Sequence, residues 1–141
     1  MIFGIGIDLL DLERIERLHQ KYGDRFERHV LTREEMSQYH SIVRKTHYLA
    51  TRFSGKEAIS KALGAGLRSP VTLHSISIIS NEVGKPVLFF DSKLQDYLDA
   101  RHVTGVFVSF SHEGSLLSSY ALAERAQPAR AQQHRDGEEE A

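Results

Sequence analysis

Two acidic residues and one lysine are the residues of this chain whose type and spacing best fit chemistry. Glu57 and Lys61 stand four positions apart, so on a helix they lie side by side on one face. Asp8 stands where an apolar first strand is expected to end. Two carboxylates from separate elements suit a magnesium-class cation, and a nearby lysine suits a phosphate. The combination indicates phosphoryl-type chemistry, with Asp8 and Glu57 as metal ligands and Asp8, Glu57 and Lys61 as catalytic residues.

Each of these residues also has a purely structural interpretation. An aspartate directly after a strand often caps the next helix, and a Glu57–Lys61 pair is most often a solvated surface pair. The site hypothesis requires the strand and the helix to pack together. Gly4 and Gly6 lie on the same strand face as Asp8 and leave room for a helix to approach the backbone. The two carboxylates would then repel each other unless a cation or a proton lay between them.

The elements that must position these residues follow from the hydrophobic pattern. We expect a strand over 2–8, a helix over about 11–22 interrupted at Gly23, and a helix beginning at Arg33 behind the capping box Thr32–Glu35. A long helix over about 47–63 should end at Gly64. Two hairpins follow, over 74–90 and 106–123, separated by a short helix that Asp91 or Ser92 caps.

This order predicts a single α+β domain, with an antiparallel sheet packed on a long central helix. The domain is expected to span residues 1–125. Residues 126–141 lack periodic apolar positions and are acidic overall, so they are predicted to form a disordered tail.

Composition excludes several classes of protein. The chain has 141 residues, of which 40% are hydrophobic, and no apolar run approaches the ~18 residues of a membrane span. It contains no cysteine, which excludes disulfides and thiolate metal sites and favours a cytoplasmic setting. The net charge is −1, and no aromatic stacking platform accompanies the basic residues. We therefore expect neither a membrane nor a nucleic-acid partner.

A basic stripe is the second functional candidate. Its members recur at helical intervals and are Arg14, Arg17, Lys21, Arg25 and Arg28. Gly23 interrupts the helix between Lys21 and Arg25. The stripe is either a solvated helix face, with neighbouring glutamates as local partners, or a landing surface for an acidic protein or a polyanion.

A third candidate is the segment Ser109–His112 at the end of a strand. A histidine at a hairpin tip is usually just exposed, whereas a serine–histidine pair can also contact a phosphate or a ribose. A Ser-His-Asp hydrolase is disfavoured because no G-x-S-x-G nucleophile elbow occurs in the chain.

Several motifs resemble those of the holo-[acyl-carrier-protein] synthases, in the phosphopantetheinyl transferase superfamily. The opening segment 4–11 is similar to their G-x-G-x-D start, and segment 52–66 is similar to their R-F-[AS]-x-K-E-A-x-x-K-A signature. Weaker matches lie at 31–35, 84–86 and 108–112. The resemblance covers residues 1 to about 125, in the same order and spacing.

The resemblance implies transfer of the phosphopantetheine arm of coenzyme A to a serine of an apo acyl carrier protein, a step of fatty acid biosynthesis. It implies magnesium on Asp8 and Glu57, and a homotrimer with active sites between subunits. Coenzyme A would contact Arg52, Lys61, Gly64, Gly84, Lys85, Pro86, Ser111 and His112. The acidic carrier would bind Arg14, Arg17, Lys21 and Arg25.

Two residues depart from the family pattern. Gly55 replaces a small non-glycine residue, and Ile59 stands where an aromatic is common. Glu113 makes the corner beside His112 more acidic, which places the phosphate roles of Ser111 and His112 in doubt. Lys56 points away from Glu57 on the helix, and we expect a structural or peripheral role for it.

Two rival functions remain open. A magnesium-dependent hydrolase of a small pyrophosphate would use the same carboxylates without a protein acceptor. A non-catalytic module could instead bind acidic proteins through the basic stripe, with Asp8 as a helix cap and Glu57–Lys61 as a surface pair.

Overall fold

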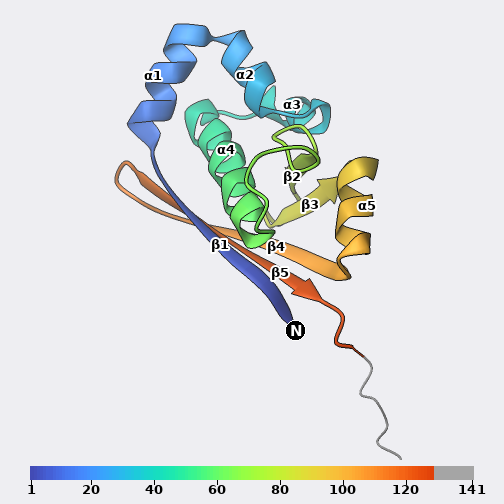
Figure 1. Cartoon of the computed structure of the whole chain (residues 1–141). Coiled ribbons are helices and arrows are strands. Elements are labelled where there is room, and N and C mark those ends of the chain that lie inside the picture. The colour runs from blue at the N-terminus through green and yellow to red at the C-terminus, as the bar shows by residue number, and fades with distance from the viewer. Residues whose placement is uncertain (129–141) are drawn as a thin grey trace, which may run out of the picture.

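The computed structural model describes residues 1–128 of the chain (Figure 1). The predicted tail lies outside the described residues from position 129 onward. The elements, in chain order, are β1 (Ile2–Asp11), α1 (Leu12–Tyr22), α2 (Asp24–Val30), α3 (Arg33–Tyr39), α4 (Lys45–Ala62), β2 (Ile76–Ser80), β3 (Pro86–Phe90), α5 (Ser92–Ala100), β4 (Val103–Glu113) and β5 (Leu116–Arg125). The predicted α+β class with antiparallel pairing is confirmed.

The strands form two separate sheets. A three-stranded antiparallel sheet has the order β1-β5-β4, and β2 pairs with β3 as an antiparallel hairpin. Both outer strands of the larger sheet are longer than the sequence predicted, because each stays paired with β5 along almost its whole length. β1 therefore continues to Asp11 rather than ending at residue 8, and β4 begins at Val103 rather than 106.

Helix α4 is the centre of the fold, as predicted, and lies across one face of the three-stranded sheet (Figure 1). A Cβ at Gly4 would lie 2.0 Å from the carbonyl oxygen of Ala62, and one at Gly6 would lie 2.0 Å from that of Ala58. These glycines therefore let the helix touch the strand backbone. Gly55 has a similar role, since a Cβ there would lie 2.8 Å from Ile78 Cδ1 and 3.0 Å from the Phe110 ring.

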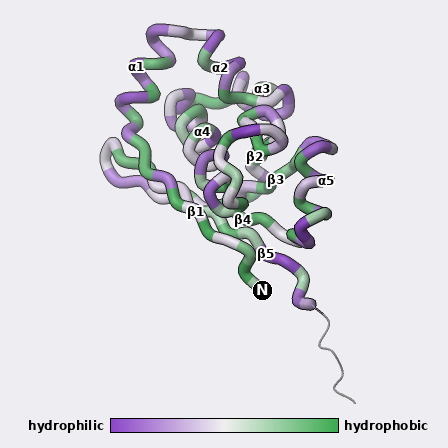
Figure 2. Tube along the Cα trace, viewed as in Figure 1, coloured by the Kyte–Doolittle hydropathy of each residue, from purple (hydrophilic) through white to green (hydrophobic). Residues whose placement is uncertain are grey.

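The N-terminal helices correct two sequence expectations. Asp11, not Asp8, is the N-cap of α1, and its carboxylate accepts a hydrogen bond of 3.0 Å from the Glu13 amide. The capping alternative for Asp8 was therefore wrong. Gly23 interrupts the helix as expected, with φ of +53°, but a second helix, α2, follows it where we had predicted none. Figure 2 shows hydrophobic and hydrophilic positions alternating along these helices, whose apolar sides pack on the first half of α4.

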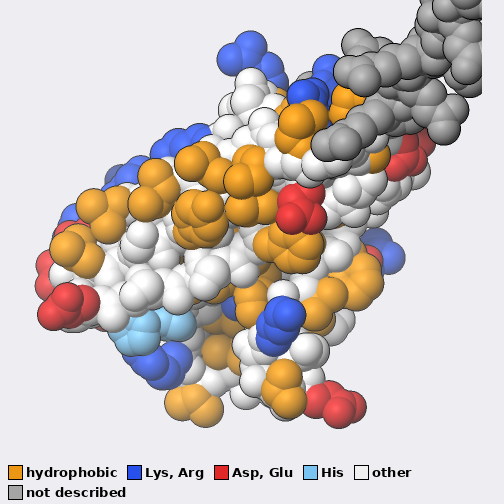
Figure 3. All heavy atoms as spheres, turned by 90° about the horizontal axis from the view of Figure 1, so that it is seen from below, with side chains coloured by type: hydrophobic (Ala, Val, Ile, Leu, Met, Phe, Trp, Pro, Cys, Tyr) orange, Lys and Arg blue, Asp and Glu red, His pale blue; other side chains and the backbone are white. Residues whose placement is uncertain are grey.

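The other face of the three-stranded sheet carries an exposed apolar patch. Ile5, Ile7 and Leu9 are 59%, 62% and 68% exposed on β1. Ile5 is in register with Leu122 of β5, which is in register with Phe107 of β4, a residue 54% exposed. Figure 3, which views the molecule from below, shows hydrophobic side chains gathered on this side. Patches of this kind mark sites of interaction with another protein, a membrane or a ligand.

Within residues 1–128, none of the helices combines the length and the hydropathy needed to cross a bilayer.

Candidate functional site

The structure brings Asp8, Glu57 and Lys61 together where β1 crosses α4. Lys61 Nζ lies 3.3 Å from Asp8 Oδ1 and donates a 2.9 Å hydrogen bond to the carbonyl oxygen of Ile7. Glu57 lies one helical turn before Lys61 on the same helix. We call these three residues the carboxylate–lysine cluster. Gly64 stands just beyond the end of α4 with φ of +69°, and its amide donates to the carbonyl oxygen of Lys61.

The electrostatics of the carboxylate–lysine cluster suit a cation. Partial burial raises the pKa of Glu57, and the negative charge of Asp8 raises it further, while Lys61 acts in the opposite direction. A divalent cation between the two carboxylates would relieve this repulsion. Across residues 1–128 no group of three or more potential metal-ligating side chains occurs. The two carboxylates alone could hold magnesium, which binds through one or two carboxylates and leaves its other positions to water and phosphate.

A buried serine pair orients Asp8. Ser54 of α4 donates a 2.7 Å hydrogen bond to Asp8 Oδ2, and Ser119 of β5 donates a 2.7 Å hydrogen bond to the Ser54 hydroxyl. Both serines are fully buried. Sequence analysis assigned them no role, although Ser54 lies within the motif that carries Glu57. Lys61 thus contacts Asp8 Oδ1, whereas the buried serine pair holds Asp8 Oδ2 from the side of the core.

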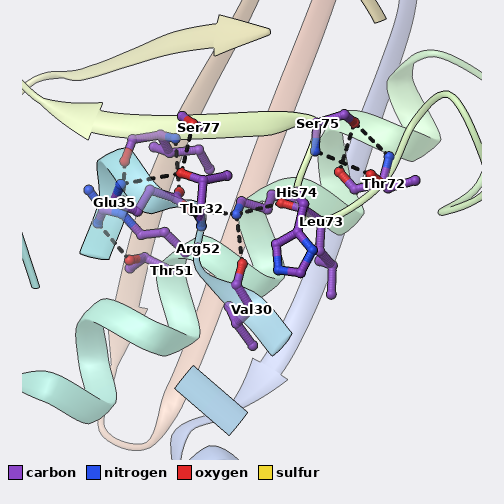
Figure 4. A network of polar contacts seen from close by, with 12 residues as sticks. Val30, Thr32, Glu35, Thr51, Arg52, Thr72, Leu73, His74, Ser75 and Ser77 are labelled. Carbon is purple, nitrogen blue, oxygen red and sulfur yellow. Dashed lines mark hydrogen bonds and ion pairs between the residues drawn. The ribbon is translucent and has the colours of Figure 1, made fainter. Parts of the chain in front are cut away.

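A second group of predicted residues lines a groove with a volume of about 690 Å³. Its lining includes five of the residues expected to contact coenzyme A: Arg52, Gly84, Lys85, Pro86 and His112. Arg52 is buried and anchored, because its Nε donates to the carbonyl oxygen of Ile78 at 3.0 Å and its guanidinium carbon lies 3.8 Å from the centre of the Tyr48 ring. Figure 4 shows Arg52 beside Thr51, to which it also donates.

Two further cationic or titratable residues of this groove were missed. Arg44 and His47 stand just before and inside the start of α4, where no sequence motif marks them. The rings of His47 and His112 lie edge to face, with centres 5.2 Å apart. Burial lowers the pKa of His47, and Arg44, His112 and Arg52 lower it further. The groove is therefore a concentration of positive charge suited to an anion.

Ser111 is not among the residues that line the groove. It is in register with Ser118, which is in register with Leu9, so it lies on the exposed face of the sheet. Ser109, two positions earlier on the same strand, is in register with Tyr120 and through it with Ile7, so it lies on the same face, although it also contributes to the groove lining.

One chain thus holds the predicted site residues in two separate places. The groove is lined by residues from the start of α4, the β2–β3 turn and β4, and its lining does not include Asp8, Glu57 or Lys61. Glu57 instead lines another cavity, of about 420 Å³.

The basic stripe is divided by the bend at Gly23. Arg14, Arg17 and Lys21 are exposed on α1, and Arg25 is exposed on α2. A cavity of about 370 Å³ lies between these helices and α4, and its lining combines Arg25 with apolar and aromatic residues: Leu18, Tyr22, Phe26, His29 and Phe53. Arg25 of the basic stripe therefore lies beside a depression that is otherwise mostly apolar and aromatic.

Comparison with known proteins shows the family. A model of the 4'-phosphopantetheinyl transferase superfamily matches residues 4–123. Because this match spans most of the chain and contains both parts of the candidate site, the chain belongs to the 4'-phosphopantetheinyl transferase superfamily.

The similar proteins within that superfamily are holo-[acyl-carrier-protein] synthases. The one from Nitrosospira multiformis is 39% identical over 125 residues, covering 89% of this chain and all of that protein. The one from Bordetella parapertussis is 40% identical over 129 residues, covering 88% and 84% of the two chains. The crystal structure of the synthase from Neisseria meningitidis superimposes with a TM-score of 0.85 at 37% identity, covering 89% of this chain and all of that one. The Bacillus anthracis synthase, in complex with CoA (3',5'-ADP), has a TM-score of 0.74 at 31% identity and covers 89% and 99%.

Proposed function

We propose that this protein is a holo-[acyl-carrier-protein] synthase, which transfers the 4'-phosphopantetheine group of coenzyme A to a serine of an apo acyl carrier protein. The products are holo acyl carrier protein and adenosine 3',5'-bisphosphate, and the carrier then serves fatty acid biosynthesis. The observation that carries the proposal is the meeting of Asp8, Glu57 and Lys61 at the crossing of β1 and α4, in a chain of this superfamily. A cytoplasmic setting, suggested by the lack of cysteine, is part of the proposal.

The residues of the carboxylate–lysine cluster have distinct parts in this reaction. Asp8 and Glu57 would hold magnesium, which supplies charge neutralisation at the pyrophosphate when bound. Lys61 donates hydrogen bonds to the phosphate oxygens, where negative charge grows as the leaving group departs. The serine oxygen forms a bond to the β-phosphorus while the bond from that phosphorus to the bridging oxygen breaks. The serine proton passes either to Glu57 or to water.

The cationic groove would bind the phosphates of coenzyme A. Arg44, Arg52 and Lys85 provide positive charge around one depression, which His112 also lines. The turn of Gly84, Lys85 and Pro86 forms one wall, and Gly84 has φ of +79°, a conformation that favours glycine. Guanidinium groups bind phosphate oxygens in pairs, so two arginines held in one groove favour a nucleotide with several phosphates.

We further propose that the chain works as a homotrimer in which one copy supplies the carboxylate–lysine cluster and its neighbour supplies the groove. The exposed apolar patch on the sheet supports association, because a monomer would leave Ile5, Ile7 and Leu9 in water. The separation of the cluster and the groove within one chain supports a shared site.

The acidic carrier would dock on α1 and α2. The apolar depression beside Arg25 and the cavity beside Glu57 share two lining residues, His29 and Phe53. A carrier bound over the basic stripe would therefore lie next to the carboxylate–lysine cluster. This shared wall favours a protein acceptor over water and supports the transferase over the pyrophosphate hydrolase.

Intact-protein mass spectrometry tests the proposed reaction. An apo acyl carrier protein incubated with this protein and coenzyme A should gain the mass of one phosphopantetheine with magnesium and none without it. Asp8→Asn and Glu57→Gln should abolish the gain. Glu34→Gln, which neutralises an exposed glutamate on α3, is the matched control and should not change it.

The rival functions predict different products. Release of adenosine 3',5'-bisphosphate without carrier would identify a hydrolase. Carrier binding that ignores coenzyme A and magnesium, with no mass gain, would identify a non-catalytic module.

A further inference from the structure

A fully buried ion pair lies directly behind Glu57. The side chains of Lys56 and Glu35 are both 0% exposed, and Lys56 Nζ lies 2.5 Å from Glu35 Oε1. Lys56 also donates to the carbonyl oxygens of Val30 and Leu73, each at 2.8 Å. An ammonium group has three N–H donors, so Lys56 has one acceptor for each. Figure 4 shows the labelled residues of this network converging from separate elements.

Glu35 ties the pair to the rest of the fold. Its Oε1 accepts a 2.9 Å hydrogen bond from the Thr32 amide, and its Oε2 accepts one of 2.9 Å from the Ile78 amide. Arg52 donates to the carbonyl oxygen of the same Ile78. The pair thus connects α3, α4 and β2.

Lys56 binds the carbonyls of two chain segments that border the cavity lined by Glu57. Leu73 lines this cavity itself, and Val30 directly follows His29, which also lines it, and we call these two segments the walls of the cavity. A third hydrogen bond joins the walls to each other, because His74 Nε2 lies 2.7 Å from the carbonyl oxygen of Arg28. Since a carbonyl only accepts, His74 donates through Nε2. Lys56 and His74 therefore link the same two segments, residues 28–30 and 73–74, beside the cavity.

We propose that Lys56 is a positioning residue that holds these two walls at the separation through which the acceptor serine reaches the carboxylate–lysine cluster. His74 assists by joining the walls at their outer side. The inference rests on the proposed function, because it concerns the route of the carrier protein. It adds to that function a role for a residue that touches neither substrate.

Packing alone does not explain the pair. An apolar pair of similar volume is often as stable as a buried ion pair, because it avoids the cost of removing two charges from water. Such a pair would fill the same space but would leave the carbonyls of Val30 and Leu73 without a donor. Unlike an apolar residue, Lys56 therefore fixes the positions of the two backbone segments that carry Val30 and Leu73.

The test separates folding from positioning. Lys56→Met alone would leave Glu35 buried and unpaired, so the informative protein is the double variant Lys56→Met/Glu35→Gln, in which both charges are removed. Circular dichroism and native mass should match the wild type. We expect kcat/KM for the apo carrier to fall by about tenfold to a hundredfold, with the KM for coenzyme A changed less than about twofold. Ser60→Ala removes a fully buried hydroxyl that bonds only within α4, and this control should keep the wild-type values.

A second variant covers the case in which the double variant does not fold. His74 is exposed, so His74→Ala should fold normally and lower kcat/KM for the carrier alone, and His74→Gln should restore it through its amide donor. Wild-type kinetics in the folded double variant and in His74→Ala would overturn the positioning role. So would equal increases in KM for both substrates. Lack of any transfer by the wild type would overturn the proposed function instead.

Discussion

Gly6 of β1 and Ala58 of α4 lie so close that a Cβ at Gly6 would come within 2.0 Å of the Ala58 carbonyl oxygen. The same Cβ would lie 2.7 Å from the Ala62 amide nitrogen. Both atoms belong to the backbone of α4, so neither can move away from the new Cβ unless the helix moves with it. This contact sets the distance between the strand that carries Asp8 and the helix that carries Glu57.

Gly6→Ala should therefore destabilise the protein and separate the two carboxylates. Overpacking of this kind typically costs about 1–3 kcal/mol, and the contact with backbone places Gly6→Ala at the upper end. Urea unfolding measures the loss, and the magnesium dependence of transfer measures the displacement of Asp8. Thr104→Ala, at an exposed position of β4, is the control. If Gly6→Ala were as stable to urea as the wild type, α4 would be able to move away from β1 without a loss of stability.

Charge reversal on the basic stripe should weaken carrier binding selectively. Arg14→Glu is expected to raise the KM of the carrier by about tenfold and leave the KM of coenzyme A nearly unchanged, with the difference shrinking in high salt. Lys93→Glu makes the same charge change on the exposed face of α5 and should affect neither constant. Equal effects of Arg14→Glu on both substrates would rule out this docking surface.

A charge within the exposed apolar patch should dissociate the assembly. Ile7 is 62% exposed on β1 and in register with Tyr120, so in a trimer Ile7→Lys would bury a charge without a partner. Native mass spectrometry should show three chains for the wild type and one for Ile7→Lys. Gln95→Lys introduces the same charge on α5 and should remain trimeric. A wild type that is monomeric and active would contradict the shared site.

Mixing two inactive variants tests the shared site directly. Asp8→Asn lacks the carboxylate–lysine cluster, and Arg44→Ala/Lys85→Ala lacks the groove. If each site combines two chains, random trimers of the two proteins should recover activity in about one quarter of their sites. Activity assays after unfolding and co-refolding measure the recovery. No recovery, with mixed trimers confirmed by mass, would place the whole site in one chain.

The groove should take up a proton when phosphates bind. Burial and the surrounding Arg44, His112 and Arg52 lower the pKa of His47, so the ring is neutral near pH 7 in the free protein. A bound polyanion opposes those charges and raises the pKa, so binding of adenosine 3',5'-bisphosphate should tighten as the pH falls. Within residues 1–128, His47 Nε2 is the one buried side-chain nitrogen or oxygen that has no hydrogen-bond partner.

Calorimetry in two buffers of different ionisation enthalpy measures this proton uptake. His47→Gln should reduce the uptake and flatten the pH dependence of the affinity. His40→Gln changes an exposed histidine outside the groove lining and should behave like the wild type. Unchanged uptake in His47→Gln would assign the proton to another group.

The sequence correctly predicted features that are encoded within a single short segment of the chain. The capping box Thr32–Glu35 is present with both hydrogen bonds, and Asp91 caps α5 as expected. Alternation along β1 correctly placed Gly4, Gly6 and Asp8 on the face that meets α4. Helix α2 was missed because its seven residues are too short for a clear apolar period.

Lys56 was expected to be structural or peripheral, and its full burial in an ion pair agrees with the first alternative, but its partner could not be foreseen. Glu35 is 21 positions away and was recognised only as the last residue of a capping box. That one carboxylate caps α3, receives Lys56 and binds β2. These contacts depend on the angle at which α3 packs on α4, which no spacing within either helix encodes.

By itself, the amino-acid sequence determined the α+β class, the central helix, the glycine face of the first strand and the residues of the carboxylate–lysine cluster. Those features follow from periodicity and capping chemistry within single segments. The tertiary structure decided that Ser54 and Lys61 hold Asp8, that the cationic groove lies apart from the carboxylates, and that the sheet leaves an apolar face open. These features join residues distant in the chain, so they depend on how whole elements pack, which local side-chain chemistry does not specify.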